Sequence, residues 1–352
     1  MIHLFRRLVV APAVIGLTVL VWVTAPLWLI AAAALSPVLP GRWRALRLLW
    51  VVILFLTCES ILLVVLFGLW LASGLGWRIR TPYFEGIHYE LVQGTLWVFF
   101  NEARRVLNLT IETAGPTPAA HPGRPILVCC RHAGPGDSFT LIHALMNDYS
   151  REPRVVLKDT LAWDPAIDTI LNRIPARFIS PSPRRRSGGT PGTEPREGED
   201  LESQIAGLAT GLDDNDAFVI FPEGGNFTPA RRQRGIDRLR RLGLERMAVR
   251  AEQMTNVLVP RPGGFIAALD AAPDADVVLV AHTGLDHLLT VGDLWRELPM
   301  DKRITMRWWT VERADIPSDR AARIEWLFGW WERIDAWIEE NAGQPEVSGE
   351  EG

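Results

Sequence analysis

Cysteine is scarce in this chain of 352 residues, which carries only Cys58, Cys129 and Cys130. One lies in an apolar segment and two are adjacent, a spacing that does not match a disulfide framework. Cys-x-x-Cys and His-Glu-x-x-His patterns are both missing, so no motif in the sequence predicts a metal site. A surplus of positive charge is missing too, since the formal net charge is -4, and we expect no nucleic-acid partner.

Charged residues are also missing from two long stretches near the N-terminus. Leu8 to Leu35 contains none, and Leu48 to Leu75 contains Glu59 alone. Because a membrane-spanning helix needs about 20 consecutive apolar residues, we expect residues 1–80 to form a membrane hairpin, with helices at about 8–35 and 48–75. A signal peptide is the alternative for the first stretch, although its apolar core is usually only about 7–15 residues long.

Arginines lie before, between and after the two apolar stretches, at residues 6–7, 42–47 and 78–80. Positive residues favour the cytoplasmic side of a membrane. A hairpin that enters and leaves by the same face therefore satisfies all three groups, and two fully spanning helices are the other possibility. Glu59 is costly within lipid, and we expect it to be neutralised or to face the interface.

From residue 81 to 342, short apolar runs alternate with amphipathic segments, which predicts an α/β domain. Residues 81–107, with their scattered aromatics, are either a connecting helix or an interfacial segment. The predicted strands are 107–112, Ile126–Cys130, Val155–Leu157, Phe178–Ile179, Phe218–Phe221, Val257–Val259, Val277–Ala281 and Ile304–Val311. The predicted helices include Ser138–Asn147, Pro165–Arg173, Leu201–Leu212, Gly264–Leu269, a basic helix from about Ile236, and Ser318–Asn341. Residues 181–199 are predicted to form a mobile surface loop, and 343–352 a disordered acidic tail.

A histidine and an aspartate follow the predicted strand Ile126–Cys130. His132 and Asp137 have four residues between them, and the Gly-Pro-Gly segment at 134–136 predicts a tight turn. Such a turn can bring the carboxylate back to the imidazole, where it fixes the tautomer and raises the basicity of the other ring nitrogen. This is a base and its orienting acid without a protein nucleophile, so the substrate would supply the hydroxyl. The alternative is ordinary turn chemistry, with Asp137 capping a helix that begins at Ser138.

A second cluster follows the predicted strand Phe218–Phe221. Pro222 breaks the strand, and Glu223 and the pair Gly224–Gly225 come next. Two glycines let backbone N–H groups approach a ligand closely and form an anion-binding nest. A plain strand-ending turn is the alternative. Because ligands of α/β sheets bind at the carboxyl ends of the strands, we expect Glu223 and His132 to share one crevice.

Together and in this order, the two clusters resemble the motifs of the glycerolipid acyltransferases, the 1-acylglycerol-3-phosphate acyltransferase superfamily. The family's His-x4-Asp motif is matched by His132 and Asp137, and its Phe-Pro-Glu-Gly motif by residues 221–224. Its apolar strand ending in proline is matched by 257–260. The continuations at 226–228 and 260–265 look most like the lysocardiolipin acyltransferase branch. The resemblance implies an α/β fold with a mixed sheet flanked by helices, and the N-terminal membrane hairpin fits it too.

The chain departs from the family pattern where the acceptor's phosphate would bind. Arg131 stands where asparagine is usual, and Gly225 and Asn226 stand where the family has Thr-Arg. The resemblance therefore implies that other arginines contact the phosphate, or that the acceptor is a different lysophospholipid or a glycolipid. The candidates are Arg131, Arg177, Arg184 and Arg231.

The resemblance implies transfer of a fatty acyl group from acyl-CoA or acyl carrier protein to the hydroxyl of a lysophospholipid, in phospholipid biosynthesis or remodelling. His132 would be the general base, Asp137 would orient it, and Glu223 would position the acceptor. The amides of Gly224 and Gly225 would face phosphate or a developing oxyanion. No metal or bound cofactor is implied, because the acyl donor is a co-substrate.

The expected partners are the lysophospholipid, the acyl donor and membrane lipids, and the expected location is the cell membrane with the catalytic domain facing the cytoplasm. Two other functions fit the same residues. A membrane-anchored hydrolase would use His132 and Asp137 to activate water, or a transacylase would take its acyl group from a phospholipid. A non-catalytic lipid-binding protein could keep the fold. The basic segment Arg231 to Arg250 is either a contact for anionic lipid or phosphorylated substrate, or an ordinary surface helix.

Overall fold

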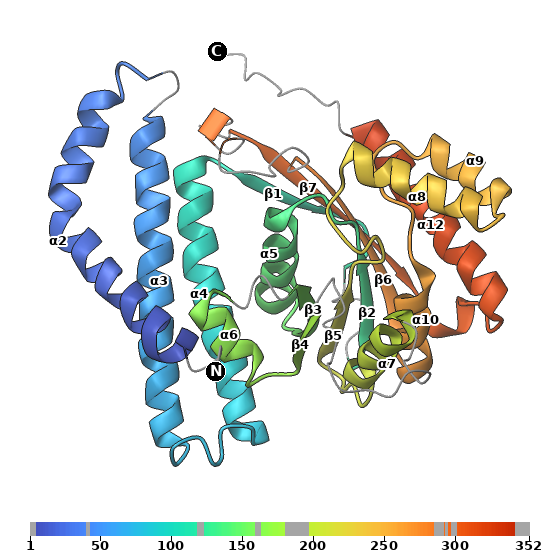
Figure 1. Cartoon of the computed structure of the whole chain (residues 1–352), viewed down its shortest axis with the longest axis horizontal. Helices are drawn as coiled ribbons and strands as arrows, with labels where there is room; N and C mark the ends of the chain where they lie inside the picture. The colour runs from blue at the N-terminus through green and yellow to red at the C-terminus, as the bar shows by residue number, and fades with distance from the viewer. Residues whose placement is uncertain are drawn as a thin grey trace, which may run out of the picture.

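A computed structural model describes residues 5–39, 43–117, 123–158, 163–179, 197–284, 292, 295–296 and 301–341. A central sheet has helices on both faces, and the N-terminal helices lie side by side along one flank (Figure 1). The predicted tail at 343–352 lies outside the described residues, as does the predicted loop at 181–199 except for 197–199, which begin a helix.

The sheet has seven strands in the described residues and is mixed, as the family resemblance implies. The strands are β1 (Thr110–Ala114), β2 (Ile126–Cys130), β3 (Glu152–Lys158), β4 (Ala176–Ile179), β5 (Asp216–Ile220), β6 (Asp276–Thr283) and β7 (Arg303–Val311). Their order across the sheet is β1-β7-β6-β2-β5-β3-β4. Strands β2 to β6 are parallel, whereas β7 pairs antiparallel with β6 and parallel with β1. The carboxyl ends of β2, β5 and β6 therefore meet at one edge.

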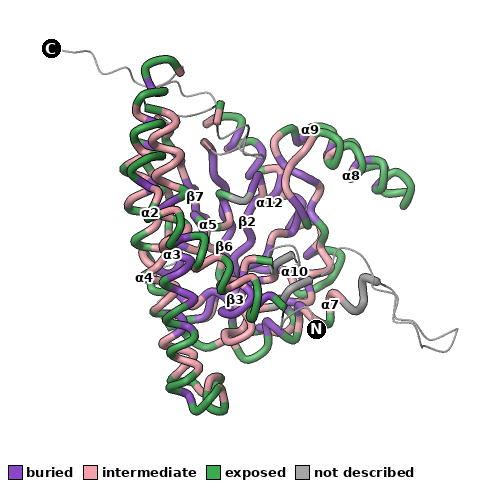
Figure 2. The backbone as a smooth tube through the Cα atoms, turned by 60° about the vertical axis from the view of Figure 1, so that its left-hand side comes forward, coloured by how far each residue is buried: buried purple, intermediate pink, exposed green. Residues whose placement is uncertain are grey.

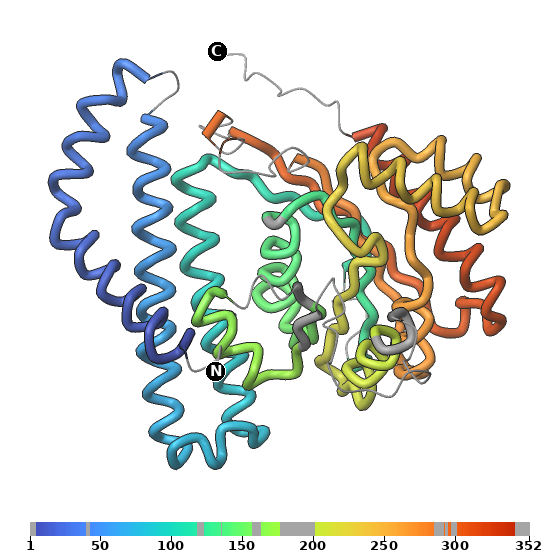
Figure 3. The backbone as a smooth tube through the Cα atoms, in the orientation of Figure 1, coloured from blue at the N-terminus to red at the C-terminus, as the bar shows by residue number. Residues whose placement is uncertain are grey.

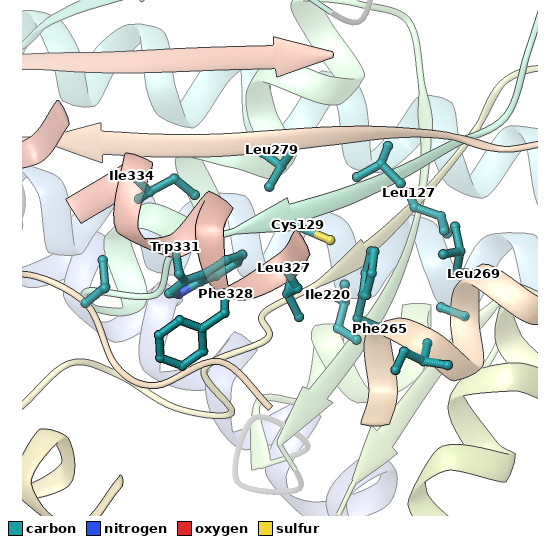
Figure 4. Close-up of a cluster of buried hydrophobic side chains, with 14 of the residues drawn as sticks. Leu127, Cys129, Ile220, Phe265, Leu269, Leu279, Leu327, Phe328, Trp331 and Ile334 are labelled. Atoms are coloured by element: carbon teal, nitrogen blue, oxygen red, sulfur yellow. The ribbon is translucent and has the colours of Figure 1, made fainter. Parts of the chain in front are cut away.

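Alternate residues of the central strands face two separate cores. On β2, Leu127 and Cys129 belong to one core and Val128 and Cys130 to the other, and all are fully buried. This two-residue period is what a strand between two apolar layers requires. Figure 2 shows the buried residues concentrated on β2 and β6, and Figure 4 shows Trp331 in the first of these cores.

Helices supply both layers. They are α2 (Ala11–Leu35), α3 (Arg44–Ala72), α4 (Pro82–Leu107), α5 (Pro135–His143), α6 (Pro165–Leu171), α7 (Glu197–Ala209), α8 (Pro229–Arg241), α9 (Glu245–Gln253), α10 (Pro262–Ala271) and α12 (Arg320–Asn341). Short π-helices lie at Arg6–Val10 (η1) and Ala144–Asp148 (η3), and a 3-10 turn at Arg313–Asp315 (η5). In Figure 3 the chain passes from the N-terminal helices on the left to α8, α9 and α12 on the right.

Two sequence predictions about these elements are wrong. The basic helix expected from Ile236 is in fact the pair α8 and α9, which Gly243 separates with a φ of +74°. The segment Val257–Val259, expected to be a strand, is irregular. The backbone N–H of Asn256, just before it, donates to Asp335 on α12 (2.6 Å), so the segment is held by a side chain and not by a neighbouring strand.

Helices α2 and α3 coincide with the two stretches expected to form a membrane hairpin. By length and composition alone, the segments Arg6–Leu35 and Arg44–Ala72 could each cross a membrane, with mean hydropathies of 2.3 and 2.7. Many of their large apolar side chains are exposed, and Val23 and Leu27 are 74% and 69% exposed. Such a surface is unfavourable in water.

Buried polar contacts join this hairpin to the rest of the protein at α6. Arg6 donates to the fully buried Asp168 (2.8 Å). Glu59, expected to be neutralised or at the interface, is buried in the protein, where it accepts a hydrogen bond from the backbone N–H of Ala166 (3.1 Å). The hairpin is therefore docked on the α/β domain by specific contacts as well as by apolar packing.

Candidate active site

The loop after β2 continues directly into α5 and forms no separate turn. Gly134 precedes the helix, and Pro135 takes its first position, where a missing N–H has no cost. This corrects two expectations, that the Gly-Pro-Gly segment forms a tight turn and that the helix begins at Ser138. Asp137 is thus in the first turn of α5. Its carboxylate accepts hydrogen bonds from the backbone N–H groups of Ala133 (2.6 Å), Gly134 (3.0 Å) and Ser138 (2.6 Å).

His132 lies directly against this carboxylate. Its Nδ1 is 3.3 Å from Oδ1 and 3.4 Å from Oδ2 of Asp137, and its ring packs on Phe221 with 4.5 Å between ring centroids. Because an ionised carboxylate only accepts hydrogen bonds, Nδ1 carries the proton and Nε2 keeps its lone pair. Nε2 has no hydrogen-bond partner among the described residues, and 13% of the side chain is exposed. His132 therefore has the geometry of a general base that a substrate can reach.

A second histidine, which the sequence analysis missed, faces the same carboxylate. The Nε2 of His282 is 3.2 Å from Oδ2 of Asp137, and the His282 side chain is only 2% exposed. His282 follows Ala281 on β6, the strand beside β2. The strand predicted from the sequence ended at Ala281. Because ligands bind at the carboxyl ends of such strands, the residue that follows, His282, could have been predicted as a site residue.

The electrostatics of Asp137 depend on both imidazoles. Burial of the carboxyl raises its pKa, but the hydrogen bond with His132 and the contact with His282 outweigh burial and hold the pKa well below its ordinary value of 3.8. Asp137 is therefore ionised at neutral pH. A charged imidazolium formed at His132 during proton transfer would be stabilised by it.

Glu223 connects the two motifs from a buried position just after β5. Its Oε2 accepts a hydrogen bond from the backbone N–H of His132 (3.4 Å), and its Oε1 accepts one from the indole N–H of Trp331 on α12 (3.2 Å). Burial raises the pKa of Glu223 to about 8, although Arg131 and these donors favour the ionised form. The geometry gives Glu223 a positioning role toward the backbone of His132.

Arg131 is buried beside Glu223 and is only 2% exposed. Its Nη1 donates to the carbonyl of His282 (3.0 Å), and its Nε to the carbonyl of Asn256 (3.2 Å). Arg131 thus ties together the ends of separate segments around the site. This geometry differs from the sequence expectation that Arg131 contacts a phosphate.

The glycine pair after Glu223 lies close to two guanidinium groups. Gly224 has a φ of +68°, and a side chain there would come within 3.3 Å of Arg261. A side chain at Gly225 would come within 3.0 Å of Arg231. The pKa of Arg261 is lowered by desolvation and by the nearby charges of Arg238 and Arg231. These arginines form a positive cluster beside the amides that the sequence predicted to bind an anion.

The predicted site residues therefore divide into two groups. Residues brought to one edge of the sheet are His132, Asp137, Glu223, Gly224, Gly225, Arg131 and Arg231. Arg177 is on the edge strand β4, with β3 and β5 between it and β2, and its side chain is outside the described part of the structure. Arg184 lies outside the described residues. Arg261 was not among the predicted site residues, although it directly follows the motif ending in Pro260.

The arrangement brings together an imidazole, a carboxylate that orients it, and a cluster of positive charge. Within the described residues, no group of three or more His, Cys, Asp and Glu side chains could hold a metal ion. The imidazole of His132 can accept and return a proton beside this cluster of positive charge.

A family model described as Acyltransferase matches residues 91–282, more than half of the chain, and its range includes His132, Asp137, Glu223 and His282. The chain belongs to the acyltransferase family, as its motifs predicted, and is an enzyme of the acyl-transfer class.

Among solved structures, the chain is similar to the crystal structure of the 1-acyl-sn-glycerophosphate (LPA) acyltransferase PlsC from Thermotoga maritima. The identity is 13%, the TM-score is 0.44, and the match covers 82% of this chain and 99% of that chain. No curated protein matches this chain in sequence.

Proposed function

We propose that this protein transfers a fatty acyl group from a thioester to the free hydroxyl of a lysophospholipid at a membrane surface. The observation that carries the proposal is the pair His132 and Asp137 at the end of β2, with Nδ1 of the ring facing the carboxylate and Nε2 left for a substrate. Membership of the acyltransferase family establishes that the reaction is an acyl transfer. We infer the acceptor and the donor from the surroundings of this pair.

The pair supports a balanced acyl-transfer step. Nε2 of His132 takes the proton of the acceptor hydroxyl while that oxygen attacks the thioester carbonyl carbon. The carbon–sulfur bond then breaks, and the imidazolium returns the proton to the leaving thiolate. Asp137 keeps the ring in the tautomer that the first proton transfer requires. A new ester and a free thiol are the products.

The arginine cluster supports a phosphorylated acceptor. Arg231 and Arg261 lie next to the Gly224–Gly225 turn. This turn directly follows Glu223 in the Phe-Pro-Glu-Gly motif, where the chain lacks the arginine that is usual in the family. Guanidinium groups bind phosphate in a planar, two-bond geometry. We infer that these two arginines replace the missing one, which puts the acceptor's phosphate close to His132.

The membrane supplies the acceptor. Helices α2 and α3 carry exposed apolar side chains and are docked on α6, so a bilayer around them would keep the α/β domain at its surface. This supports a location at the cell membrane, with the catalytic domain on the cytoplasmic side where acyl-CoA and acyl carrier protein are found. No resident cofactor takes part in the proposed step.

The experiment is an acyl-transfer assay with the full chain in detergent. Labelled acyl-CoA or acyl carrier protein would be supplied with a panel of lysophospholipids, beside His132→Ala. We expect product with one or more lysophospholipids and a loss of roughly 10²–10⁴-fold in the variant, the usual contribution of a general base. An unchanged unfolding temperature would show that His132→Ala is folded.

Other outcomes would overturn the proposal. Release of free fatty acid without an acceptor would identify a hydrolase. Product formed only from a phospholipid donor would identify a transacylase. Full activity in His132→Ala would remove His132 from the mechanism.

A further inference from the structure

A polar cleft lies on the α12 side of the sheet. Its volume is about 420 Å³, and it opens between β7 and the last turns of α12. The lining residues are Arg307, Trp309, Arg333, Ala336, Trp337, Glu340 and Asn341. Four of these are polar, so the cleft suits a polar ligand better than an acyl chain.

Two guanidinium groups of this cleft lie against indole rings and have no hydrogen-bond acceptor in the part of the chain that the structure describes. The Cζ of Arg307 lies 5.5 Å from the ring centroid of Trp309, and that of Arg333 lies 4.6 Å from the ring centroid of Trp330. Neither side chain has an ion pair within the described residues, and Nε of Arg307 is buried with no partner there. Glu340 contributes one opposing charge, so the cleft is positive overall. Guanidinium donors that have no acceptor within the described residues favour a phosphate.

Indole groups are the other notable part of the lining. Trp309 and Trp337 meet edge to face, with 6.0 Å between their ring centroids and an angle of 89° between the rings. Aromatic side chains of this kind stack on nucleic-acid bases without regard to sequence. Arginines beside indoles therefore match a ligand that carries both a phosphate and a planar base.

The cleft is close to the site described above. Arg307 pairs across the sheet with Ala281, near the carboxyl end of β6. Ala281 faces the α12 core, whereas the next residue, His282, faces Asp137 on the other side of the sheet. On α12, Trp331 donates to the carboxyl of Glu223, and Trp337 in the cleft is six residues further along, about 9 Å at 1.5 Å per residue. A ligand bound in the cleft would therefore have to pass around the carboxyl edge of the sheet to bring its other end to His132, which requires a long flexible arm.

We propose that this cleft binds the phosphorylated adenosine end of acyl-CoA. The proposal rests on the proposed acyl-transfer function and names its donor. In acyl-CoA, a flexible phosphopantetheine arm separates the nucleotide from the thioester, so the nucleotide must bind away from the reacting carbon. Acyl carrier protein has the same arm but no nucleotide, and lysophospholipid has a phosphate but no planar base.

The first test measures binding and needs no turnover. Calorimetry of the full chain in detergent would use CoA and adenosine 3′,5′-bisphosphate as probes. Arg333→Gln and Trp337→Leu should each weaken binding of both probes by about tenfold, a change that calorimetry resolves easily. The matched control is Arg320→Gln, an exposed arginine at the other end of α12, which should bind as the unaltered chain does. Equal binding by all variants, or no binding of either probe, would overturn the proposal.

The second test separates the donor from the acceptor. In the acyl-transfer assay, Arg333→Gln should raise KM for acyl-CoA about tenfold and leave both kcat and KM for the lysophospholipid nearly unchanged, as expected for lost uniform binding. Rates with acyl carrier protein as donor should not change. A raised KM for the lysophospholipid instead would assign the cleft to a lipid phosphate and sink the proposal.

The two proposals can fail separately. If CoA binds in the cleft but no acceptor is acylated, the assignment of the cleft to CoA is supported and the proposed acyl-transfer function is wrong. If acyl transfer proceeds and the cleft variants bind CoA normally, the proposed function is supported and the assignment of the cleft to CoA is wrong.

Discussion

Asp137 is the residue on which the site depends most, because two imidazoles and three backbone N–H groups converge on one buried carboxylate. His132 and His282 approach it from β2 and β6, at 3.3 Å and 3.2 Å. A group with this many donors keeps its charge even in a buried place. The carboxylate thus both orients the imidazole of His132 and anchors the first turn of α5.

Replacing this charge should reduce stability in a pH-dependent way. The pKa of Asp137 is held well below the ordinary value of 3.8, so the ionised form stabilises the folded state above that pH, and the stabilisation is lost as the pH falls through the folded pKa. We expect Asp137→Asn to lower the free energy of unfolding by about 3 kcal/mol at pH 7. This difference between the natural chain and the variant should become smaller below pH 4. Denaturant unfolding at several pH values would measure it. A gap that widens in acid would contradict the account.

Glu223 should show the opposite dependence on pH. Its folded-state pKa is raised to about 8 from 4.5, so the folded state holds the proton more tightly, and stability falls as the pH rises from 4.5 to 8. We expect Glu223→Gln to remove this slope, which is at most about 1.4 kcal/mol per pH unit. The comparison is denaturant unfolding of both chains across that range, and parallel curves would show that the carboxyl is already ionised in the fold.

At the scale of single elements, the end of β6 is a sensitive point. Gly284 has a φ of +99°, and a Cβ there would lie 2.4 Å from the carbonyl oxygen of Arg303. Because neither backbone can move without opening the β6–β7 pair, we expect Gly284→Ala to cost about 3 kcal/mol and to lower acyl transfer by displacing His282.

The matched control for that variant is Gly329→Ala. Gly329 lies inside α12, and a Cβ there would have no described atom within 4 Å apart from those of its chain neighbours and the nearby helix backbone. Alanine there should raise stability by about 0.5–1 kcal/mol because it restricts the unfolded chain and favours the helix. Thermal unfolding of the two variants would compare their unfolding temperatures. Equal shifts in unfolding temperature would mean that the close contact at Gly284 does not determine the stability of the β6–β7 pair.

Elements also show how far the sequence could predict the fold. The fully buried runs such as β2 and β5 were predictable because they are short, apolar and bounded by breakers. Val257–Val259 has the same composition but no strand beside it, and only the tertiary structure gives Asn256 a bond to Asp335. Likewise, Pro135 starts α5 where a Gly-Pro-Gly segment favours a turn.

The candidate site was predictable only in part, for a related reason. His132, Asp137 and Glu223 stand in local motifs that follow strands, so the sequence contains their signal. His282 and Arg261 join the site because β6 lies next to β2 and because the chain after Pro260 returns to the Pro222 carbonyl, which Arg261 contacts through its N–H (2.8 Å). Strand order and loop contacts of this kind are set by the whole fold.

At the scale of the whole molecule, the docking of the hairpin can be tested at Arg6. Its partner Asp168 is fully buried, so removing the arginine leaves a buried carboxylate without its closest cation. We expect Arg6→Gln to cost about 3 kcal/mol and to lower the thermal unfolding temperature in detergent. Arg78→Gln, at an exposed position after α3, is the control. No difference between the two would show that apolar packing alone holds the hairpin.

The positions of the three cysteines have a practical consequence for labelling. Cys129 and Cys130 are fully enclosed in opposite cores, whereas Cys58, in the middle of α3, is half-buried. A maleimide fluorophore or spin label should therefore attach to Cys58 alone, and the natural chain already carries a single-site depth probe. Attachment by a lipid-soluble reagent but not by a water-soluble one would place the centre of α3 inside the bilayer, whereas attachment by both would place it in water.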